Sequence, residues 1–207
     1  MIAMGYLFAA LLGYLLGSSH MAFYISKKKQ LDIRTAGSGN LGASNVTVLF
    51  GWKAGVLTAV HDVLKAALAV WLARHLFPGA EHAGALAGVA AVLGHVFPFY
   101  LKFKGGKGLA SYFGMTLALN WKIALITAVV ILLATVITDF ISVGALSAIV
   151  VVPVCAGITT HSLLLVCILC AGSAVMLYKH QENIVRIARK EEIGLRSTIR
   201  GDKRVDK

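Results

Sequence analysis

Phosphate-binding chemistry is the first chemistry that this sequence indicates, because glycines, hydroxyls and amides gather in one segment of an otherwise apolar chain. Residues 37–45 read GSGNLGASN. The glycines let neighbouring backbone amides converge, and the serines and asparagines add donors, so the segment predicts an anion-binding loop at a helix N-terminus. A polar loop that only joins and caps two helices is an equal alternative. The segment also matches G-x-G-x-x-G, but an apolar helix rather than a strand precedes it, which excludes a dinucleotide-binding fold.

A second segment places lysines among glycines. Residues 94–108 read GHVFPFYLKFKGGKG, with Lys104 and Lys107 flanking two glycines. It is not a Walker A loop, because Leu101 stands where that motif has glycine and Gly108 where it has serine or threonine. The alternative is that these are ordinary lysines at the cytoplasmic edge of a membrane helix. That alternative explains the positive charge, but it does not explain why glycines stand among the lysines. We therefore interpret the segment as a second phosphate loop.

A third polar segment follows the last apolar run. His180, Asn183 and Arg186 recur every three residues, so they lie near one face of a helix. An imidazole, an amide and a guanidinium on one face suit a phosphorylated ligand, and arginine binds phosphate through paired hydrogen bonds. The alternative is an exposed polar turn that has just left the membrane.

Two charged residues stand inside an apolar helix. Asp62 and Lys65 are three residues apart, so they share a helix face and can pair. Each costs about 2.5–3.5 kcal/mol at the centre of a bilayer on insertion scales, and such residues usually have a functional role. We expect them to orient the first loop, and a structural ion pair that braces the bundle is an equal alternative.

The composition indicates what must position these groups. The chain has 207 residues, of which 58% are hydrophobic and 14% charged, and its mean hydropathy is +0.79. A soluble domain has about 25% charged residues, so an all-α integral membrane protein is expected, as one domain over residues 1–207. We expect about seven transmembrane helices, over about residues 2–25, 54–76, 83–101, 107–119, 121–138, 141–158 and 161–178.

The fourth of these runs is the uncertain one, since its apolar part of about 13 residues reaches only about 20 Å. Basic residues set the orientation. With the N-terminus outside, the seven-span topology leaves only Lys65, Arg74 and Lys122, of the 20 lysines and arginines, outside the cytoplasmic segments. The C-terminal tail, basic from about residue 179, is then cytoplasmic.

The net charge of +11 therefore indicates the cytoplasmic face and phosphate-bearing partners rather than nucleic acid. The three cysteines lie in apolar surroundings, and the lone C-x-x-C of Cys167 and Cys170 is weak evidence for a metal. We expect no metal and no cofactor.

In this order, the segments resemble the membrane acyl-phosphate:glycerol-3-phosphate acyltransferases of bacteria, the PlsY family. The family's motifs are similar to residues 34–45 (RTAGSGNLGASN), 62–65 (DVLK), 94–108 and 180–186 (HQENIVR). The chain differs from the family at Val48, where arginine is usual, and at Ser44, where threonine is usual.

The resemblance implies transfer of a fatty acyl group from acyl phosphate to the 1-hydroxyl of glycerol 3-phosphate, which gives lysophosphatidic acid and phosphate as the first step of phospholipid synthesis. It implies a multi-pass protein of the bacterial inner membrane, surrounded by membrane lipids, with its active site at the cytoplasmic face, and we expect a monomer. By the same resemblance, Ser38, His95, Lys104 and Asn183 are catalytic; Arg34, Gly37, Gly39, Asn40, Ser44, Asn45, Gly105, Gly106, Lys107, His180 and Arg186 bind substrate or phosphate; and Asp62 and Lys65 support them.

Two other functions stay open from the sequence. The same anion-binding loops could serve a small transporter or binder of phosphorylated metabolites, or a divergent paralogue without activity. A transporter predicts polar residues at the midplane of several spans and repeat symmetry. Here the polar groups gather at the cytoplasmic edge, which favours the enzyme.

Overall fold

The structure, a computed structural model, describes residues 2–200, and every regular element in that range is helical. Apolar runs of helix length alternate with short polar turns, which is why helices with internally satisfied backbones form. The elements are α1 (Ile2–Ser18), α2 (Met21–Lys28), α3 (Ala43–Phe50), α4 (Trp52–Leu76), α5 (Ala83–Val96), η1 (Phe99–Leu101), α6 (Leu109–Leu119), α7 (Trp121–Thr138), α8 (Ile141–Thr160), α9 (Leu163–Ala188) and α10 (Leu195–Arg200).

Six stretches of the described chain are long and apolar enough to cross a membrane. The first combines α1 and α2, the third combines α5 and η1, and α4, α7, α8 and α9 supply the others. The uncertain fourth run of the sequence forms α6, whose 11 residues reach about 16 Å against about 30 Å of hydrocarbon. The all-helical membrane fold is therefore confirmed, whereas the expected count of seven spans is not.

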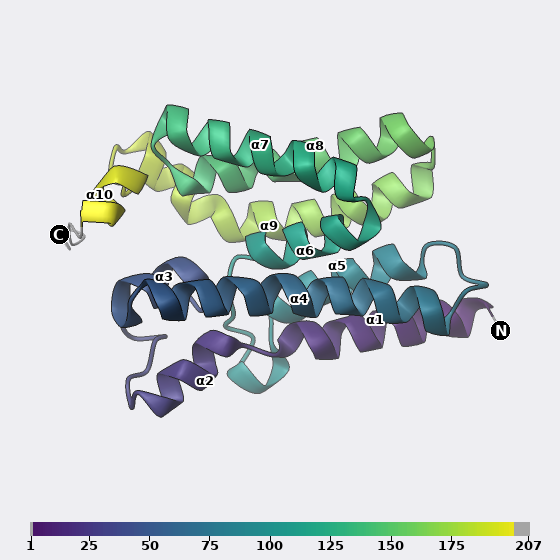
Figure 1. Ribbon diagram of the computed structural model, residues 1–207, viewed down its shortest axis with the longest axis horizontal. Helices are drawn as coiled ribbons and strands as arrows, with labels where there is room; N and C mark the ends of the chain where they lie inside the picture. Colours follow the sequence, from purple (N-terminus) through teal and green to yellow (C-terminus); the bar gives the residue numbers. More distant parts are fainter. Residues whose placement is uncertain (1, 201–207) are drawn as a thin grey trace.

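The helices form two layers in Figure 1, with α1, α4 and α5 in one and α7, α8 and α9 in the other. Helix α6 lies between them, and α4, α5 and α7 pack against it. The N-terminus and α10 lie at opposite ends of the bundle. Helices α5 and α6 run in opposite directions and are joined by residues 97–108 about halfway along the bundle. Within this loop, η1 extends to the α1 and α2 side of the bundle, where Phe99 lies beside Tyr14 and Tyr100 beside Phe23 (Figure 1).

Small residues bring α1 and α5 together. A Cβ atom on Gly13 would collide with the backbone carbonyl of Ala87, and one on Gly17 would collide with that of Ala91. This close approach places α5 firmly against α1. The hydroxyl of Tyr14 also donates to the carbonyl of Phe97 at 2.8 Å, so α1 holds the beginning of the 97–108 loop as well.

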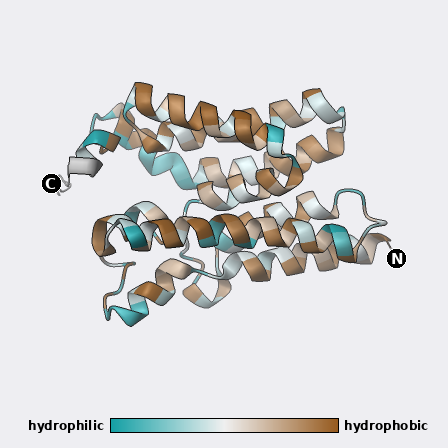
Figure 2. Ribbon diagram, in the orientation of Figure 1, coloured by the Kyte–Doolittle hydropathy of each residue, from teal (hydrophilic) through white to brown (hydrophobic). Residues whose placement is uncertain are grey.

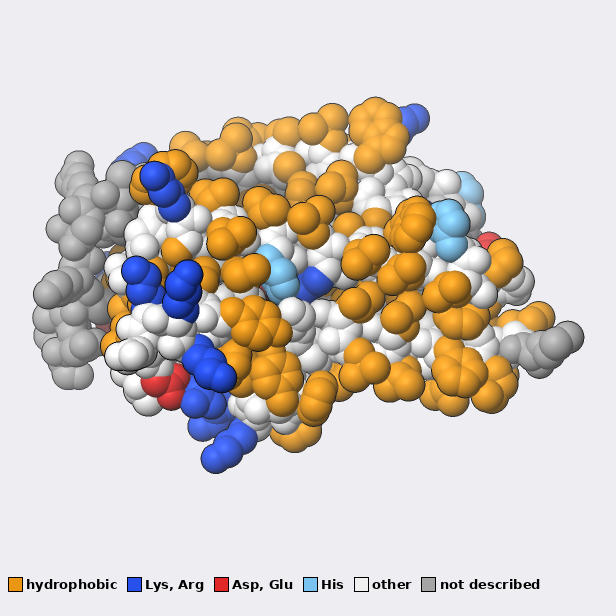
Figure 3. Space-filling model, turned by 60° about the horizontal axis from the view of Figure 1, so that its bottom comes forward, with side chains coloured by type: hydrophobic (Ala, Val, Ile, Leu, Met, Phe, Trp, Pro, Cys, Tyr) orange, Lys and Arg blue, Asp and Glu red, His pale blue; other side chains and the backbone are white. Residues whose placement is uncertain are grey.

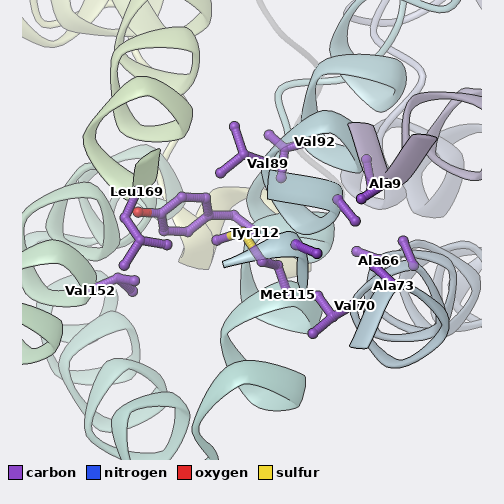
Figure 4. Packing of buried hydrophobic residues seen from close by; sticks show 14 of the residues in the cluster. Ala9, Ala66, Val70, Ala73, Val89, Val92, Tyr112, Met115, Val152 and Leu169 are labelled. Atoms are coloured by element: carbon purple, nitrogen blue, oxygen red, sulfur yellow. The ribbon is translucent and has the colours of Figure 1, made fainter. Parts of the chain in front are cut away.

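The core joins the two layers around one aromatic residue of α6. Tyr112 is fully buried and, as Figure 4 shows, lies between Val89 of α5 and Leu169 of α9. Its hydroxyl makes a 2.8 Å hydrogen bond with Ser173. Met115, one turn further along α6, fills the space beside Gly88 and Val70 of the other layer.

The surface matches a bilayer environment. Hydrophobic residues cover the outward faces of the long helices, while hydrophilic residues concentrate near α2, α10 and the nearby end of α9 (Figure 2). Figure 3 shows the same division in space: the lysines and arginines of this face gather mainly at one end, and apolar side chains cover most of the rest. The basic end is the end that carries the candidate site.

Candidate active site

The three polar segments meet in one pocket at the basic end of the bundle. The pocket has a volume of about 290 Å³ and lies between the 29–42 loop, the 97–108 loop and the last turns of α9. Four cationic side chains line it, against one carboxylate. The lining residues are Ser38, Gly39, Asn40, Lys104, Gly105, Lys107, Tyr178, Lys179, Gln181, Glu182 and Arg186. The arrangement suits a ligand that carries phosphate.

The first loop is organised around the buried side chain of Asn45. Its Nδ2 donates to the carbonyls of Asn40 at 3.0 Å, Ala36 at 3.2 Å and Ile33 at 3.4 Å, and its Oδ1 accepts from the backbone amide of Ser38 at 2.9 Å. The polar atoms of this side chain are therefore directed at the loop itself. In this structure Asn45 braces the loop and does not line the pocket.

Glycine is required at two positions of the same loop. Gly37 and Gly39 have φ angles of +58° and +67°, a region that other L-residues rarely adopt. A Cβ atom on Gly37 would also collide with Oδ1 of Asn45. The tight turn that follows places Ser38, Gly39 and Asn40 at the pocket.

The second loop is held by its glycines in a way that differs from a phosphate cradle. The amides of Gly105 and Gly106 donate to the carbonyls of Val96 and His95, both at 3.1 Å, so they satisfy the C-terminal end of α5. A Cβ atom on Gly106 would collide with the ring of His95. The two glycines thus lock the loop onto α5, and Lys104, Gly105 and Lys107 are the residues of this loop that line the pocket.

The third segment is linked to the second through Asn183. Lys107 Nζ donates to Asn183 Oδ1, which ties the loop to α9. His180 is buried, and its Nδ1 lies 2.8 Å from the carbonyl of Met176, so this nitrogen donates within the helix. Arg186 lines the pocket and lies 3.8 Å from the carboxylate of Glu182.

Glu192 is a site residue that the sequence analysis missed. It lies just after α9, and its carboxylate accepts from Arg186 Nε at 2.6 Å, Asn183 Nδ2 at 2.5 Å and Ser142 Oγ at 3.1 Å. Partial burial raises the pKa of Glu192, but the hydrogen bonds from Arg186 and Asn183 outweigh that effect and hold the pKa below its usual value. The available signal was a carboxylate pair, at residues 191–192, in a basic tail.

The predicted pairing of Asp62 and Lys65 is confirmed. Lys65 Nζ lies 2.8 Å from Asp62 Oδ1 and 2.9 Å from Nδ1 of His95, and it donates to the carbonyl of Ser19 at 2.6 Å. The side chains of Asp62, Lys65 and His95 are all buried. The pair reaches the second loop through His95, whose ring contacts Gly106.

Arg34 and Ser44, which the sequence analysis proposed as binding residues, lie apart from the pocket lining, and so does Val48, where the family usually has arginine. Arg34 pairs with Asp32 at 2.9 Å on an exposed turn, and this hydrogen bond lowers the pKa of Asp32 and raises that of Arg34. Ser44 is in the first turn of α3 and does not line the pocket. Val48, further along α3, has a side chain exposed to 63%.

Comparisons with known proteins place the chain among enzymes. The family model described as glycerol-3-phosphate acyltransferase matches residues 7–190. A glycerol-3-phosphate acyltransferase 1 from Oceanobacillus iheyensis is 38% identical over 204 residues, covering 94% of this chain and 97% of the relative. A glycerol-3-phosphate acyltransferase from Jannaschia is 42% identical over 185 residues, covering 88% and 89%.

Solved structures of the integral membrane glycerol 3-phosphate acyltransferase PlsY share the fold. Its glycerol 3-phosphate form has a TM-score of 0.86 and 32% identity, covering 91% of this chain and 94% of that one. Its lysophosphatidic acid form has a TM-score of 0.84 and 31% identity, covering 94% and 98%. The resemblance drawn from the motifs is thereby confirmed.

Proposed function

The chain belongs to the glycerol-3-phosphate acyltransferase family, and we propose that it uses acyl phosphate as the donor, transferring the acyl group to the 1-hydroxyl of glycerol 3-phosphate. The observation that supports this reaction is the cationic pocket of about 290 Å³ at one end of an apolar bundle. Both substrates carry phosphate and the donor carries a fatty chain, so they suit a polar pocket beside membrane-embedded helices. The transporter and the inactive paralogue are not favoured by this family membership.

The donor's phosphate is assigned to the 37–45 loop and the two lysines. Acyl phosphate is a mixed anhydride, so the enzyme mainly has to position it and stabilise the leaving phosphate. Ser38, Asn40 and Lys104 line the pocket together and supply neutral and charged donors. As the carbon–oxygen bond to phosphate breaks, negative charge moves onto the phosphate, and Lys104 and Lys107 stabilise it there.

The acceptor is assigned to the α9 side of the pocket. Arg186 can bind the phosphate of glycerol 3-phosphate, and Asn183 lies one helical turn before it. The carboxylate of Glu192 accepts hydrogen bonds from both Asn183 and Arg186 and so fixes the orientation of their side chains. The acceptor hydroxyl then attacks the acyl carbon, and the departing phosphate takes the hydroxyl proton, so the reaction balances without a separate base.

Several residues have positioning roles in this scheme. Asn45 braces the first loop, and the glycines at 105 and 106 lock the second. His95 connects the Asp62–Lys65 pair to Gly106, so the buried pair keeps Lys104 and Lys107 in place. The sequence assigned Arg34, Ser44 and His180 to substrate or phosphate binding, but none of them lines the pocket, so this scheme gives them no direct contact with the substrates.

We also propose that the N-terminus is outside the cell and that α10 and the basic tail are cytoplasmic. The two ends of the bundle differ in charge as the positive-inside rule requires, with Lys27, Lys28, Lys29 and Lys53 at the end that carries the pocket. The active site then faces the cytoplasm from the bacterial inner membrane. We also propose that the enzyme acts as a monomer.

The experiment is phosphate release by the purified protein in lipid with palmitoyl phosphate, with and without glycerol 3-phosphate. The expected result is release that depends on glycerol 3-phosphate, with an equal amount of lysophosphatidic acid. Release without the acceptor would indicate a hydrolase, and no release from folded protein would contradict acyl phosphate as the donor.

A further inference from the structure

A second buried polar cluster lies next to the phosphate pocket, where the beginning of α2 meets α4 and α5. It consists of His20, His61, Asp62, Lys65 and His95. One ligand atom from each of His20, Asp62 and His95 lies within 4.8 Å of the other two, and all three side chains are buried. These residues are far apart in the sequence, so no metal-binding spacing marks them.

His20 is the residue that the acyltransferase reaction does not explain. Its side chain is fully buried, and neither ring nitrogen has a hydrogen-bond partner within residues 2–200. The centre of its ring lies 4.8 Å from that of His95. A buried imidazole without partners is costly unless something else uses its lone pair.

We propose that His20, Asp62 and His95 bind one divalent transition-metal ion of the zinc class, and that its binding inhibits the enzyme. Imidazole nitrogens with a carboxylate oxygen are ligands that zinc, nickel and cobalt accept. His95 Nδ1 and Asp62 Oδ1 are 3.4 Å apart. Two ligands of a tetrahedral zinc ion, each bonded at about 2.0–2.2 Å, are separated by about 3.3–3.5 Å. This pair is therefore already spaced for one ion.

The remaining ligands need little rearrangement. The ring of His20 has no hydrogen bond to break as it moves toward the other two groups. His61 Nδ1 lies 3.5 Å from the same Asp62 oxygen and lacks a hydrogen bond, while its Nε2 is fixed by Ser19 Oγ at 3.1 Å. A fixed second nitrogen is the arrangement that orients metal-binding histidines, so His61 can complete the coordination.

Lys65 competes with the metal for this position. Its Nζ lies 2.8 Å from Asp62 Oδ1 and 2.9 Å from His95 Nδ1, so the ammonium is the cation between the two ligands. An entering ion must displace it toward the carbonyl of Ser19, which already accepts from it. The structure thus predicts that the metal ion replaces the Lys65 ammonium, and that the affinity of the site for metal rises when this ammonium is removed.

Inhibition follows from the contacts of His95. Its ring lies against Gly106, and its carbonyl accepts from the amide of Gly106. A metal ion that pulls the His95 ring toward itself and displaces Lys65 also shifts Gly106, and with it the loop that carries Lys104 and Lys107. The inhibition rests on the proposed function, whereas the binding does not.

The experiment titrates metal-free protein, without an affinity tag, with Zn²⁺ in equilibrium dialysis and with Co²⁺ in visible absorption. The expected result is one ion per chain with intense tetrahedral Co²⁺ bands. His20→Leu is expected to weaken binding at least tenfold, whereas His75→Leu, at an exposed histidine of α4, is not. Lys65→Met is expected to bind at least tenfold more tightly than the wild type.

Activity measurements separate the two parts of the proposal. Zn²⁺ is expected to inhibit the wild type over the range in which it binds and to leave His20→Leu, which retains its basal activity, uninhibited. Binding that His20→Leu does not weaken, or absence of binding in both the wild type and Lys65→Met, overturns the site. Binding without inhibition of an active enzyme overturns its regulatory role. If the wild type shows no acyl transfer at all, the Co²⁺ bands still test the site.

Discussion

Replacing Asn45 with alanine removes the side chain around which the first phosphate loop is built. Three backbone carbonyls lose a donor, and the amide of Ser38 loses its acceptor. Each intramolecular hydrogen bond contributes about 0.5–1.5 kcal/mol, and the 3.4 Å contact to Ile33 contributes least. The loss is therefore about 3 kcal/mol, which corresponds to about a hundredfold shift in the equilibrium between the ordered and disordered loop.

A shift of that size is measurable in enzyme kinetics. We expect Asn45→Ala to raise the KM for palmitoyl phosphate at least tenfold in purified protein, because the ordered loop is the form that binds the donor. Asn120→Ala is the matched control. Asn120 caps α7 by accepting from the amides of Lys122 and Ile123, so its loss costs about 0.5–2 kcal/mol of stability. Asn120 lies outside the phosphate pocket, so its KM should not change. An unchanged KM in Asn45→Ala at full folding would refute the role of the brace.

Two further substitutions test the second loop and the α9 side. Gly106→Ala places a methyl group against the buried ring of His95, so turnover should fall more than tenfold. The control is Gly79→Ala, which should behave as wild type because no atom lies within 4 Å of the added Cβ. Equal activity of the two variants would argue against a locked loop. Glu192→Gln should raise the KM for glycerol 3-phosphate severalfold and lower the melting temperature. The folded protein holds the pKa of Glu192 below its usual value of about 4.5. The ionised carboxylate therefore stabilises the fold fully above about pH 4.5, and this stabilisation disappears as the pH falls through the lowered pKa of the folded state. The melting-temperature difference between wild type and Glu192→Gln should therefore vanish in acid, and a difference that persists there would contradict the ionised contact.

Much of this architecture follows from local sequence. Apolar runs of helical length predicted the spanning helices, and the spacing of Asp62 and Lys65 predicted their pairing, because both depend only on helix geometry. The glycines of residues 37–45 predicted a loop rather than a regular element, and the structure has a loop there in which Gly37 and Gly39 adopt positive φ angles. The fourth apolar run, whose crossing of the bilayer the sequence left uncertain, forms the short helix α6.

What the sequence could not predict depends on contacts between distant segments. The glycines at 105 and 106 look like a phosphate cradle until α5 is placed beside them, where their amides meet the carbonyls of Val96 and His95. Asn45 looks like a ligand until its partners in the loop are known. His20 has no local pattern, and Glu192 has only the carboxylate pair at residues 191–192, so only the packing of the helices shows that they meet His95 and Arg186.

The measurement that tests the central claim most directly is acyl transfer by Lys104→Met beside Lys53→Met. Both substitutions remove one lysine at the basic end of the bundle, but only Lys104 lines the pocket. The account predicts that Lys104→Met loses most of its turnover while remaining folded, and that Lys53→Met, an exposed position, keeps wild-type turnover with equal amounts of phosphate and lysophosphatidic acid. Near-normal turnover in Lys104→Met, or an equal loss in both variants, would contradict the assignment of this pocket as the active site.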